Sequence, residues 1–136
     1  MPTMIWSQEM SVGVAILDED HKKLIAMINE LHEAMQHGRS KEVFADILGR
    51  LSAYTVEHFG REEDFLAETG YPSLDLHHRV HEKLKADVAA IRRKFDEGVD
   101  AALQIDTLQF LQDWLQNHIL QTDKRYVAHL NAHDIR

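Results

Sequence analysis

Apolar residues recur every three or four positions along most of the chain, which is the spacing of one face of a helix. Four stretches carry this pattern, and no run alternates apolar and polar residues as a half-buried strand would. We expect an arm over residues 1–17 and helices over 18–37, 41–69, 73–97 and 101–131. Short connections between such helices favour antiparallel neighbours. The pattern therefore predicts one all-α domain, residues 1–136, folded as an up-down-up-down four-helix bundle.

Several residues at the ends of these stretches are of types that begin or stop helices. Asp18 and Ser73 are suited to cap an N-terminus, and Ser40 is a further candidate cap. Gly38 and Gly98 follow the first and third stretches, where glycine often ends a helix. We take these residues as the expected helix boundaries.

Ionisable residues interrupt all four apolar stripes, at positions where Leu or Ile would be expected. These residues are His21 in the first stretch, His58 and Glu62 in the second, His77 and His81 in the third, and His118 and Asp123 in the fourth. Burying such groups without partners is costly, and a metal would satisfy all seven. A spacing of four residues places His58 and Glu62 on one helix face, one turn apart, as two ligands of one site require. His77 and His81 share this spacing.

His118 and Asp123 do not fit the same rule, because they are five residues apart. On a regular α-helix, with about 100° of rotation per residue, their side chains would diverge. A wider π-type turn would bring them together. We therefore expect a π-bulge, a kink or a helix end between them. A regular helix with Asp123 facing solvent would remove that residue from the site.

The composition narrows the chemistry that such a site can carry. The chain has 10 histidines and no cysteine, so its metal ligands must be imidazoles and carboxylates. With 15 Lys and Arg against 23 Asp and Glu, its net charge of −8 argues against nucleic acid as a partner. No apolar run approaches the roughly 18 residues of a membrane span, and the N-terminus lacks the charged segment of a signal peptide. We expect a soluble, cytoplasmic protein that binds no membrane.

Four motifs follow one another in a fixed order along the chain. They are His21-x-x-Leu24 with Asn29, Leu31 and His32; His58-Phe59-x-x-Glu62-Glu63; His77-x-x-x-His81; and Trp114-Leu115-x-Asn117-His118-Ile119 with Asp123. This ordered set resembles the hemerythrin family, specifically the single-domain bacteriohemerythrins, over nearly the whole sequence. An arm anchored by Ile5 and Trp6 fits as well. One departure is Asp20, where relatives usually carry Gln or Glu, and we expect it to alter hydrogen bonding around the site and not ligation.

The resemblance implies a non-haem di-iron centre with an oxo or hydroxo bridge. It implies that His77, His81 and His118 hold one iron, that His21 and His58 hold the other, and that Glu62 and Asp123 bridge both. The first iron would then have six ligands and the second five, which leaves one octahedral position open for a small diatomic molecule. We expect reversible dioxygen binding, for transport, storage or delivery, and not catalysis.

Apolar side chains should enclose the open position, because water and anions displace bound dioxygen and speed oxidation of the iron. The candidates lie within a turn of the ligands and are Leu24, Ile28, Phe59, Trp114, Leu115 and Ile119. Ordinary core packing is the alternative role for each of them, and the two roles are compatible.

Other ionisable residues near the motifs are expected to have ordinary roles. These are the histidines His32, His37, His78, His129 and His133. We expect Glu63 to face solvent, because it points around the helix from Glu62. The acidic residues 18–20 are interpreted as a helix N-terminus.

Two further functions could use the same centre. One is an oxygen or redox sensor that acts through a partner, and the other is an enzyme that reduces peroxide or nitric oxide. The Glu-x-x-His motif of ferritin-like di-iron proteins is absent from the sequence. An oxygen carrier is the most economical hypothesis. We expect a monomer, with a protein that accepts oxygen or electrons as a candidate partner.

Overall fold

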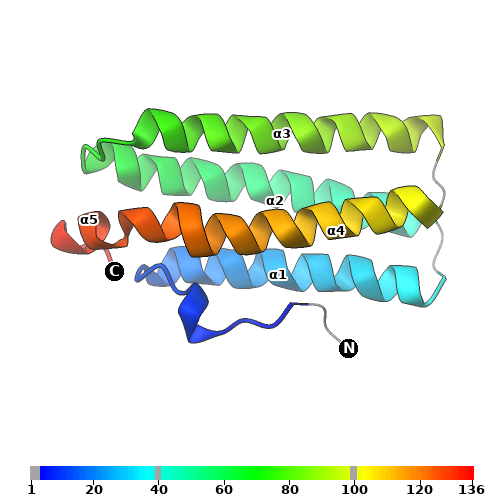
Figure 1. The fold of residues 1–136 in the computed structure, drawn as a ribbon, viewed down its shortest axis with the longest axis horizontal. Helices are drawn as coiled ribbons and strands as arrows, with labels where there is room; N and C mark the ends of the chain where they lie inside the picture. Colours follow the sequence, from blue (N-terminus) through cyan, green and yellow to red (C-terminus); the bar gives the residue numbers. More distant parts are fainter. Residues whose placement is uncertain (1–3, 39–40, 99–100) are drawn as a thin grey trace.

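A computed structural model describes residues 4–38, 41–98 and 101–136, and the regular elements within these ranges are all helical. Four long helices form a bundle, namely α1 (Ala15–Gln36), α2 (Lys41–Glu68), α3 (Leu74–Glu97) and α4 (Ala101–Asn117). They run alternately in opposite directions along a common axis (Figure 1). The predicted all-α, up-down-up-down bundle is confirmed. Within the described ranges, no helix combines the length and apolar character needed to cross a membrane.

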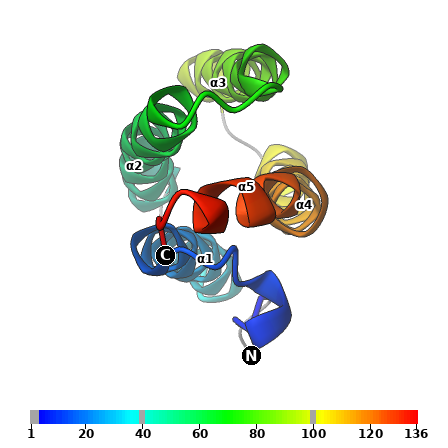
Figure 2. The same cartoon turned by 90° about the vertical axis from the view of Figure 1, so that its left-hand side faces the viewer.

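The chain continues beyond α4 through three short helical segments. They are a π-helix over His118–Thr122, a 3-10 helix over Asp123–Tyr126, and α5 over Val127–Ala132. We call the first of these the π-segment. It is one of the three forms that the spacing of His118 and Asp123 predicts. Seen down the bundle, α5 lies across one end of the helices (Figure 2).

The N-terminal arm runs along the outside of α1 before it enters that helix (Figure 1). The backbone of Met4 is tied to the Asn29 amide, which accepts from Met4 N at 3.0 Å and donates to Met4 O at 2.8 Å. Trp6 packs against the core, as expected. Ile5 is 71% exposed, so the expectation that it anchors the arm is wrong.

The first helix begins at Ala15, one turn before Asp18, so the expected N-cap role of Asp18 is wrong. Its carboxylate instead accepts hydrogen bonds from Ser11 Oγ at 2.6 Å and from the Val12 amide at 2.8 Å. These bonds fasten the turn that leads into α1. The chain therefore enters the helix earlier than the pattern of apolar residues indicates.

Other helix boundaries lie close to the expected positions. Ser73 stands at the N-cap of α3, although its side chain makes no capping hydrogen bond. Gly38 follows α1 with φ of 60°, a left-handed conformation that glycine adopts without strain. Gly98 ends α3. The candidate cap Ser40 lies outside the described residues.

Two apolar clusters fill the interior and leave the ionisable residues between them. The larger runs along the four helices, and the smaller closes the end near α5 and contains Val12, Val14, Leu17, Leu66, Tyr126 and Leu130. On α1, His21 falls between Leu17 of the smaller cluster and Leu24 of the larger. Glu62 has the corresponding position on α2. The bundle thus holds a polar layer between two apolar ones.

Candidate metal centre

Seven ionisable side chains from the long helices and the segments after α4 meet in the bundle interior. They form two groups that share Glu62 and Asp123, one adding His77, His81 and His118, and the other adding His21 and His58. The nitrogen and oxygen atoms of each group lie within 4.8 Å of one another, and all seven side chains are buried. The structure therefore brings together every residue that the interrupted stripes single out.

Glu62 divides its two carboxylate oxygens between the two groups. Its Oε1 lies 3.2 Å from His81 Nε2 and also contacts His77 Nε2. Its Oε2 lies 3.2 Å from His58 Nε2 and 4.0 Å from His21 Nε2. One side chain on α2 thus faces both groups of histidines.

The two carboxylate oxygens of Asp123 are also divided between the two groups. Its Oδ1 lies 2.9 Å from His118 Nε2 and 3.3 Å from His77 Nε2, while its Oδ2 lies 3.2 Å from His21 Nε2. Despite these short distances, neither oxygen has hydrogen-bonding geometry with any described residue. A buried carboxylate without hydrogen bonds is costly, whereas a cation between the oxygens and the nitrogens would satisfy it.

The imidazoles approach one another through their Nε2 atoms. His21 and His58 have Nε2 atoms 3.1 Å apart, and those of His81 and His118 are 3.2 Å apart. Each pair can share one proton, or both nitrogens can turn their lone pairs toward a cation. Imidazole and carboxylate donors in this number suit first-row transition metals such as iron. The residues present therefore fit a pair of metal ions.

The π-segment explains how Asp123 reaches His118. The Asp123 amide donates a hydrogen bond to the carbonyl of His118, five residues earlier, as in a π-helix. A full turn is therefore completed between the two residues, and both side chains face the interior. The predicted widening of the turn is what delivers the second shared carboxylate to the cluster.

The electrostatics follow from burying two carboxylates among imidazoles. Burial favours the neutral form of Glu62, but hydrogen bonds from histidines hold its pKa well below the usual range. Burial acts to lower the pKa of His77, yet contacts with Asp123 and Glu62 raise it to about 10. For His58, hydrogen bonds to Asp20 and Glu62 outweigh burial and raise the pKa to about 9. Without a cation the cluster holds protons, which a metal ion would displace.

Asp20 is buried and lies against the outer edge of His58. Its Oδ2 accepts hydrogen bonds from His58 Nδ1 at 3.0 Å and from Arg61 Nε at 2.9 Å. Its Oδ1 accepts from the Tyr54 hydroxyl at 2.6 Å. Burial raises the pKa of Asp20, but these hydrogen bonds outweigh it and hold the pKa well below its usual value. The interpretation of residues 18–20 as only a helix N-terminus is therefore wrong for Asp20.

Glu63 has a similar relation to His81, so the expectation that it faces solvent is wrong. Its Oε2 lies 2.9 Å from His81 Nδ1, and its Oε1 contacts His78 Nδ1. Only 19% of the Glu63 side chain is exposed. Burial raises the pKa of this carboxyl, but its contacts with His81 and His78 outweigh burial and lower the pKa. His78, although outside the two groups, thus helps to hold an anion beside His81.

Tyr126 is a third polar neighbour of the cluster, and the sequence pattern places it only among the apolar positions. The fully buried hydroxyl donates a hydrogen bond to Glu62 Oε2 at 3.1 Å. Burial and the nearby carboxylates of Glu62 and Asp123 raise the pKa of this phenol, which therefore remains a donor. Tyr126 ends the 3-10 helix that Asp123 begins, so one short segment supplies both groups.

Three further histidines have ordinary roles, as predicted. His37 Nδ1 lies 2.9 Å from the carbonyl of Glu33 at the end of α1. His129 Nε2 contacts Thr69 Oγ1 at 2.9 Å, and His133 Nδ1 contacts the carbonyl of His129 at 2.8 Å. None of the three takes part in the two groups described above.

Aromatic side chains cover the histidines on the side of the larger apolar cluster. Phe59 stacks on His81 with ring centroids 3.7 Å apart and an angle of 4° between the planes. Trp114 stacks on His118 with centroids 4.5 Å apart and an angle of 15°. These rings separate two of the imidazoles from the rest of the bundle interior.

A small cavity of about 20 Å³ lies in this apolar region. It is lined by Leu24, Ile28, Leu51, Thr55, Leu84, Val88, Leu111, Trp114 and Leu115. Of the residues expected to enclose a bound gas, Leu24, Ile28, Trp114 and Leu115 are in this lining. Phe59 packs on His81 instead, and Ile119 is fully buried in the larger cluster.

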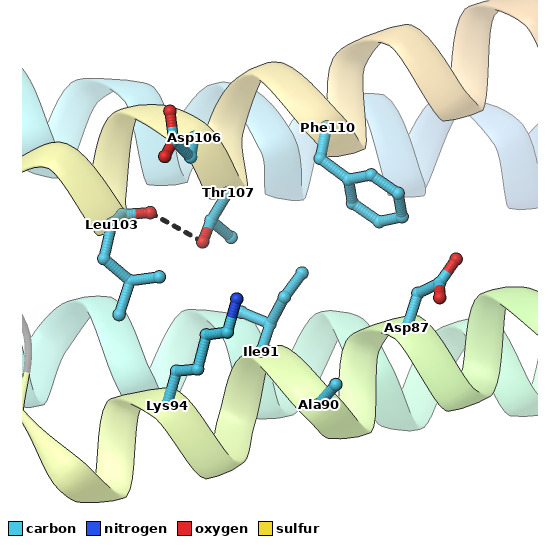
Figure 3. A pocket seen from close by; sticks show the side chains of 8 residues that line it. All are labelled: Asp87, Ala90, Ile91, Lys94, Leu103, Asp106, Thr107 and Phe110. Atoms are coloured by element: carbon cyan, nitrogen blue, oxygen red, sulfur yellow. Dashed lines mark hydrogen bonds between the residues drawn. The ribbon is translucent and has the colours of Figure 1, made fainter.

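A larger groove of about 370 Å³ lies between α3 and α4, toward the C-terminal end of α3. Its lining comprises Asp87, Ala90, Ile91 and Lys94 from α3, and Leu103, Asp106, Thr107 and Phe110 from α4 (Figure 3). The Thr107 hydroxyl donates to the carbonyl of Leu103 at 2.8 Å, within the same helix. None of these residues belongs to the histidine cluster, so the groove is separate from the candidate centre.

Comparisons with known proteins agree with this arrangement. The family described as the hemerythrin HHE cation binding domain matches residues 12–130. A bacteriohemerythrin from Stenotrophomonas maltophilia is 33% identical over 133 residues, which cover 98% of this chain and 85% of that relative. A bacteriohemerythrin from Methylococcus capsulatus is 35% identical over 133 residues, which cover 97% of this chain and 100% of that relative. A crystal structure of wild-type hemerythrin has a TM-score of 0.84 at 32% identity, covering 94% of this chain and 98% of that one.

Proposed function

This chain belongs to the hemerythrin family, and we propose that it binds dioxygen reversibly at two iron ions held in the bundle core. The observation that carries the proposal is the division of Glu62 and Asp123 between two groups of histidines. Each carboxylate offers one oxygen to each group, as a bridge between two ions requires. The proposed physiological role is to carry, store or deliver dioxygen.

The two groups differ in their number of donors, and this difference gives them different roles. The proposed ligands are His77, His81 and His118 for one ion, His21 and His58 for the other, and Glu62 and Asp123 for both. The group of His21 and His58 offers one imidazole fewer, so an ion held there would keep a position for an added molecule. When bound, a di-iron centre supplies that open position and two electrons to dioxygen.

Asp20 and Glu63 determine which ring nitrogen carries the proton in two of the histidines, His58 and His81. A carboxylate can only accept a hydrogen bond, so Nδ1 of His58 and of His81 must carry the proton. Their Nε2 atoms are then free to donate lone pairs toward the cluster centre. Such outer partners fix the orientation of a ligand histidine and raise its basicity.

The apolar cavity beside Trp114 suits dioxygen better than water. Its volume of about 20 Å³ is enough for one water-sized molecule. A water there would need polar partners, and the polar side-chain groups among the described lining residues are the Thr55 hydroxyl and the indole N–H of Trp114. The Thr55 hydroxyl already donates to the carbonyl of Leu51 at 2.7 Å. We infer that the cavity holds an apolar gas near the centre and excludes the water that would promote oxidation.

Metal analysis combined with an optical spectrum tests this proposal. We expect two irons per chain, and a spectral change on adding dioxygen to the reduced protein that reverses under vacuum. Asp123→Ala should abolish the two-iron stoichiometry, whereas His129→Ala, a histidine outside the cluster, should leave it intact. Fewer than two irons in the wild-type protein would contradict the assignment. Steady consumption of peroxide or nitric oxide, without recovery of the reduced protein, would favour an enzyme. A difference between the oxygenated and the oxygen-free protein in affinity for a partner protein would favour a sensor.

A further inference from the structure

A second pocket, of about 170 Å³, opens between the start of α3 and the segments that follow α4. It is lined by Tyr71, Ser73, Leu76, His77, Val80, Thr122 and Arg125. None of these residues is acidic, although the chain has 23 Asp and Glu and a net charge of −8. Leu76 and Val80 form an apolar wall, and the other side chains can all donate hydrogen bonds. The pocket is therefore a basic hollow in an acidic protein.

Most polar groups of this pocket make no hydrogen bond with the residues that the structure describes. Arg125 makes no hydrogen bond or ion pair with any residue in the described ranges, although its charge acts on Tyr71. The hydroxyls of Tyr71, Ser73 and Thr122 also make no hydrogen bond there. A guanidinium and three hydroxyls are thus available to one ligand.

His77 forms the inner wall of the pocket and connects it to the candidate metal centre. The residue is only 3% exposed, and its Nε2 faces Glu62 and Asp123. Its Nδ1, on the opposite side of the ring, has no hydrogen-bond partner among the described residues. The Nδ1 atoms of His21 and His118 also lack partners, but they are fully enclosed, whereas that of His77 is not. His77 is therefore a buried side chain whose Nδ1 reaches this pocket without a hydrogen-bond partner among the described residues.

The start of α3 adds backbone donors beside the same residues. The amides of Leu74 and His77 donate to the carbonyls of Tyr71 and Ser73 at 3.2 and 3.0 Å. The amide of Leu76, between them, has no backbone acceptor in the described chain, as is usual in the first turn of a helix. Such amides favour an anion at a helix N-terminus.

We propose that this pocket binds a small oxyanion, which pairs with Arg125 and accepts a hydrogen bond from Nδ1 of His77. The inference rests on the proposed metal site, because ligation through Nε2 places the remaining proton of the ring on Nδ1. The oxyanion has the same relation to His77 that Asp20 has to His58. It differs in being exchangeable, so the concentration of an external anion sets the environment of one metal ligand.

The donors in the pocket define the chemistry of its ligand. Arginine recognises planar or tetrahedral oxyanions through two parallel hydrogen bonds, and the hydroxyls supply further donors. Both inorganic phosphate and a short carboxylate such as formate have the required oxygens. The volume of about 170 Å³ admits either of them but not a nucleotide.

Nuclear magnetic resonance of the zinc-loaded protein, labelled with ¹⁵N in its histidines, tests the proposal. Titration with inorganic phosphate, and separately with formate, should produce a saturable shift of the His77 ring signals. Saturation by phosphate alone identifies a tetrahedral oxyanion, and saturation by formate alone identifies a carboxylate. In iron-loaded protein, the same anion should also shift the reduction potential.

Two variants separate the pocket from direct binding at the metal. Arg125→Gln should weaken the saturable binding by about tenfold or more, because a charge-assisted pair is lost. Lys124→Gln removes the neighbouring exposed cation, which does not line the pocket, and should change the affinity by less than about twofold. An anion bound directly to the metal would keep its affinity in Arg125→Gln, and that result would overturn the proposal.

Metal content, measured on the same samples, distinguishes failure of the oxyanion site from failure of the proposed metal site. If metal binds but no saturable shift of His77 occurs at millimolar anion, the oxyanion site is wrong and the proposed function stands. If neither zinc nor iron binds, the proposed function is wrong. Without a metal on Nε2, the proton of the His77 ring is not confined to Nδ1, so the proposed oxyanion site would be wrong as well.

Discussion

The Nδ1 atom of His58 and the guanidinium of Arg61 donate hydrogen bonds to the same oxygen of Asp20, at 3.0 and 2.9 Å. Arg61 is partly exposed, whereas Asp20 and His58 are buried. Hydrogen bonds between charged groups therefore connect Arg61 near the surface, through Asp20, to His58 in the bundle interior. These hydrogen bonds fix the orientation of the His58 ring.

Asp20→Asn should weaken metal binding by the group that contains His21 and His58. A neutral amide is a poorer acceptor for the His58 proton, and the substitution leaves Arg61 without its buried counter-ion. Loss of such an outer partner usually costs about 10- to 100-fold in metal affinity. Competition with a chelator measures the effect, with Glu19→Gln, an exposed neighbouring acid, as the control. Equal affinities in the two variants would show that Asp20 does not act through His58.

Tyr126→Phe should destabilise the metal-free protein by about 1–3 kcal/mol, because the variant removes one donor to a buried, ionised carboxylate. The ring itself is kept, so packing in the smaller apolar cluster is unchanged. Free energies of unfolding from urea titrations measure the loss. Tyr71→Phe is the matched control, since the Tyr71 hydroxyl makes no hydrogen bond with the described residues. A loss as large in the control would argue against the Glu62 contact.

The stability of the metal-free protein should decline at alkaline pH. An unfolded histidine has a pKa near 6.5, whereas His58 and His77 in the folded protein have pKa values of about 9 and 10. Their extra protons stabilise the folded state fully below pH 6.5, and this contribution is lost as the pH rises through 9 and 10. Denaturant unfolding at a series of pH values measures the decline.

Metal loading provides the control for this pH dependence. A bound ion displaces the protons from His58 and His77, so the loaded protein should keep its stability over the same alkaline range. His129→Ala in the metal-free protein should retain the decline, because His129 lies outside the cluster. A metal-free protein with constant stability from neutral to alkaline pH would contradict the assignment.

Leu24→Ala should accelerate oxidation of the oxygenated protein. Removing this side chain enlarges the apolar cavity and gives water room to enter it. Leu48→Ala is the matched control, since Leu48 is equally buried but does not line the cavity. Both variants should lose about 2–5 kcal/mol of stability. Decay of the oxygenated spectrum should be faster only in Leu24→Ala, and equal rates would assign Leu24 to packing alone.

The fold and the cluster could be predicted because both depend on one periodicity. The stripes define the faces that pack together, and residues within a stripe necessarily meet in the interior. His118 and Asp123 break the α-helical period, and the π-segment that resolves the discrepancy follows from the geometry of a five-residue step. The entry into α1 could not be placed, because hydrogen bonds from the arm to Asp18 decide it.

The outer partners of the histidines could not be predicted in the same way. Glu63 lies about 100° around α2 from Glu62, which on a single helix indicates a residue facing away from the site. It reaches His81 because α2 and α3 pack side by side, and the period of one helix contains no information about its neighbour. Tyr126 occupies an apolar stripe, where the pattern does not distinguish a phenol that only packs from one that also donates a hydrogen bond.

The π-segment and the five-residue step from His118 to Asp123 depend on each other. If residues 118–122 continued as a regular α-helix at their present length, everything downstream would rotate by about 100°. Asp123, Tyr126 and Leu130, all fully buried, would then turn away from the interior together. A regular α-helix could present the same side chains only with one residue fewer, because a step of four residues keeps two side chains on one face. One wide turn therefore holds a shared carboxylate, its neighbouring phenol and the apolar closure of the bundle in register.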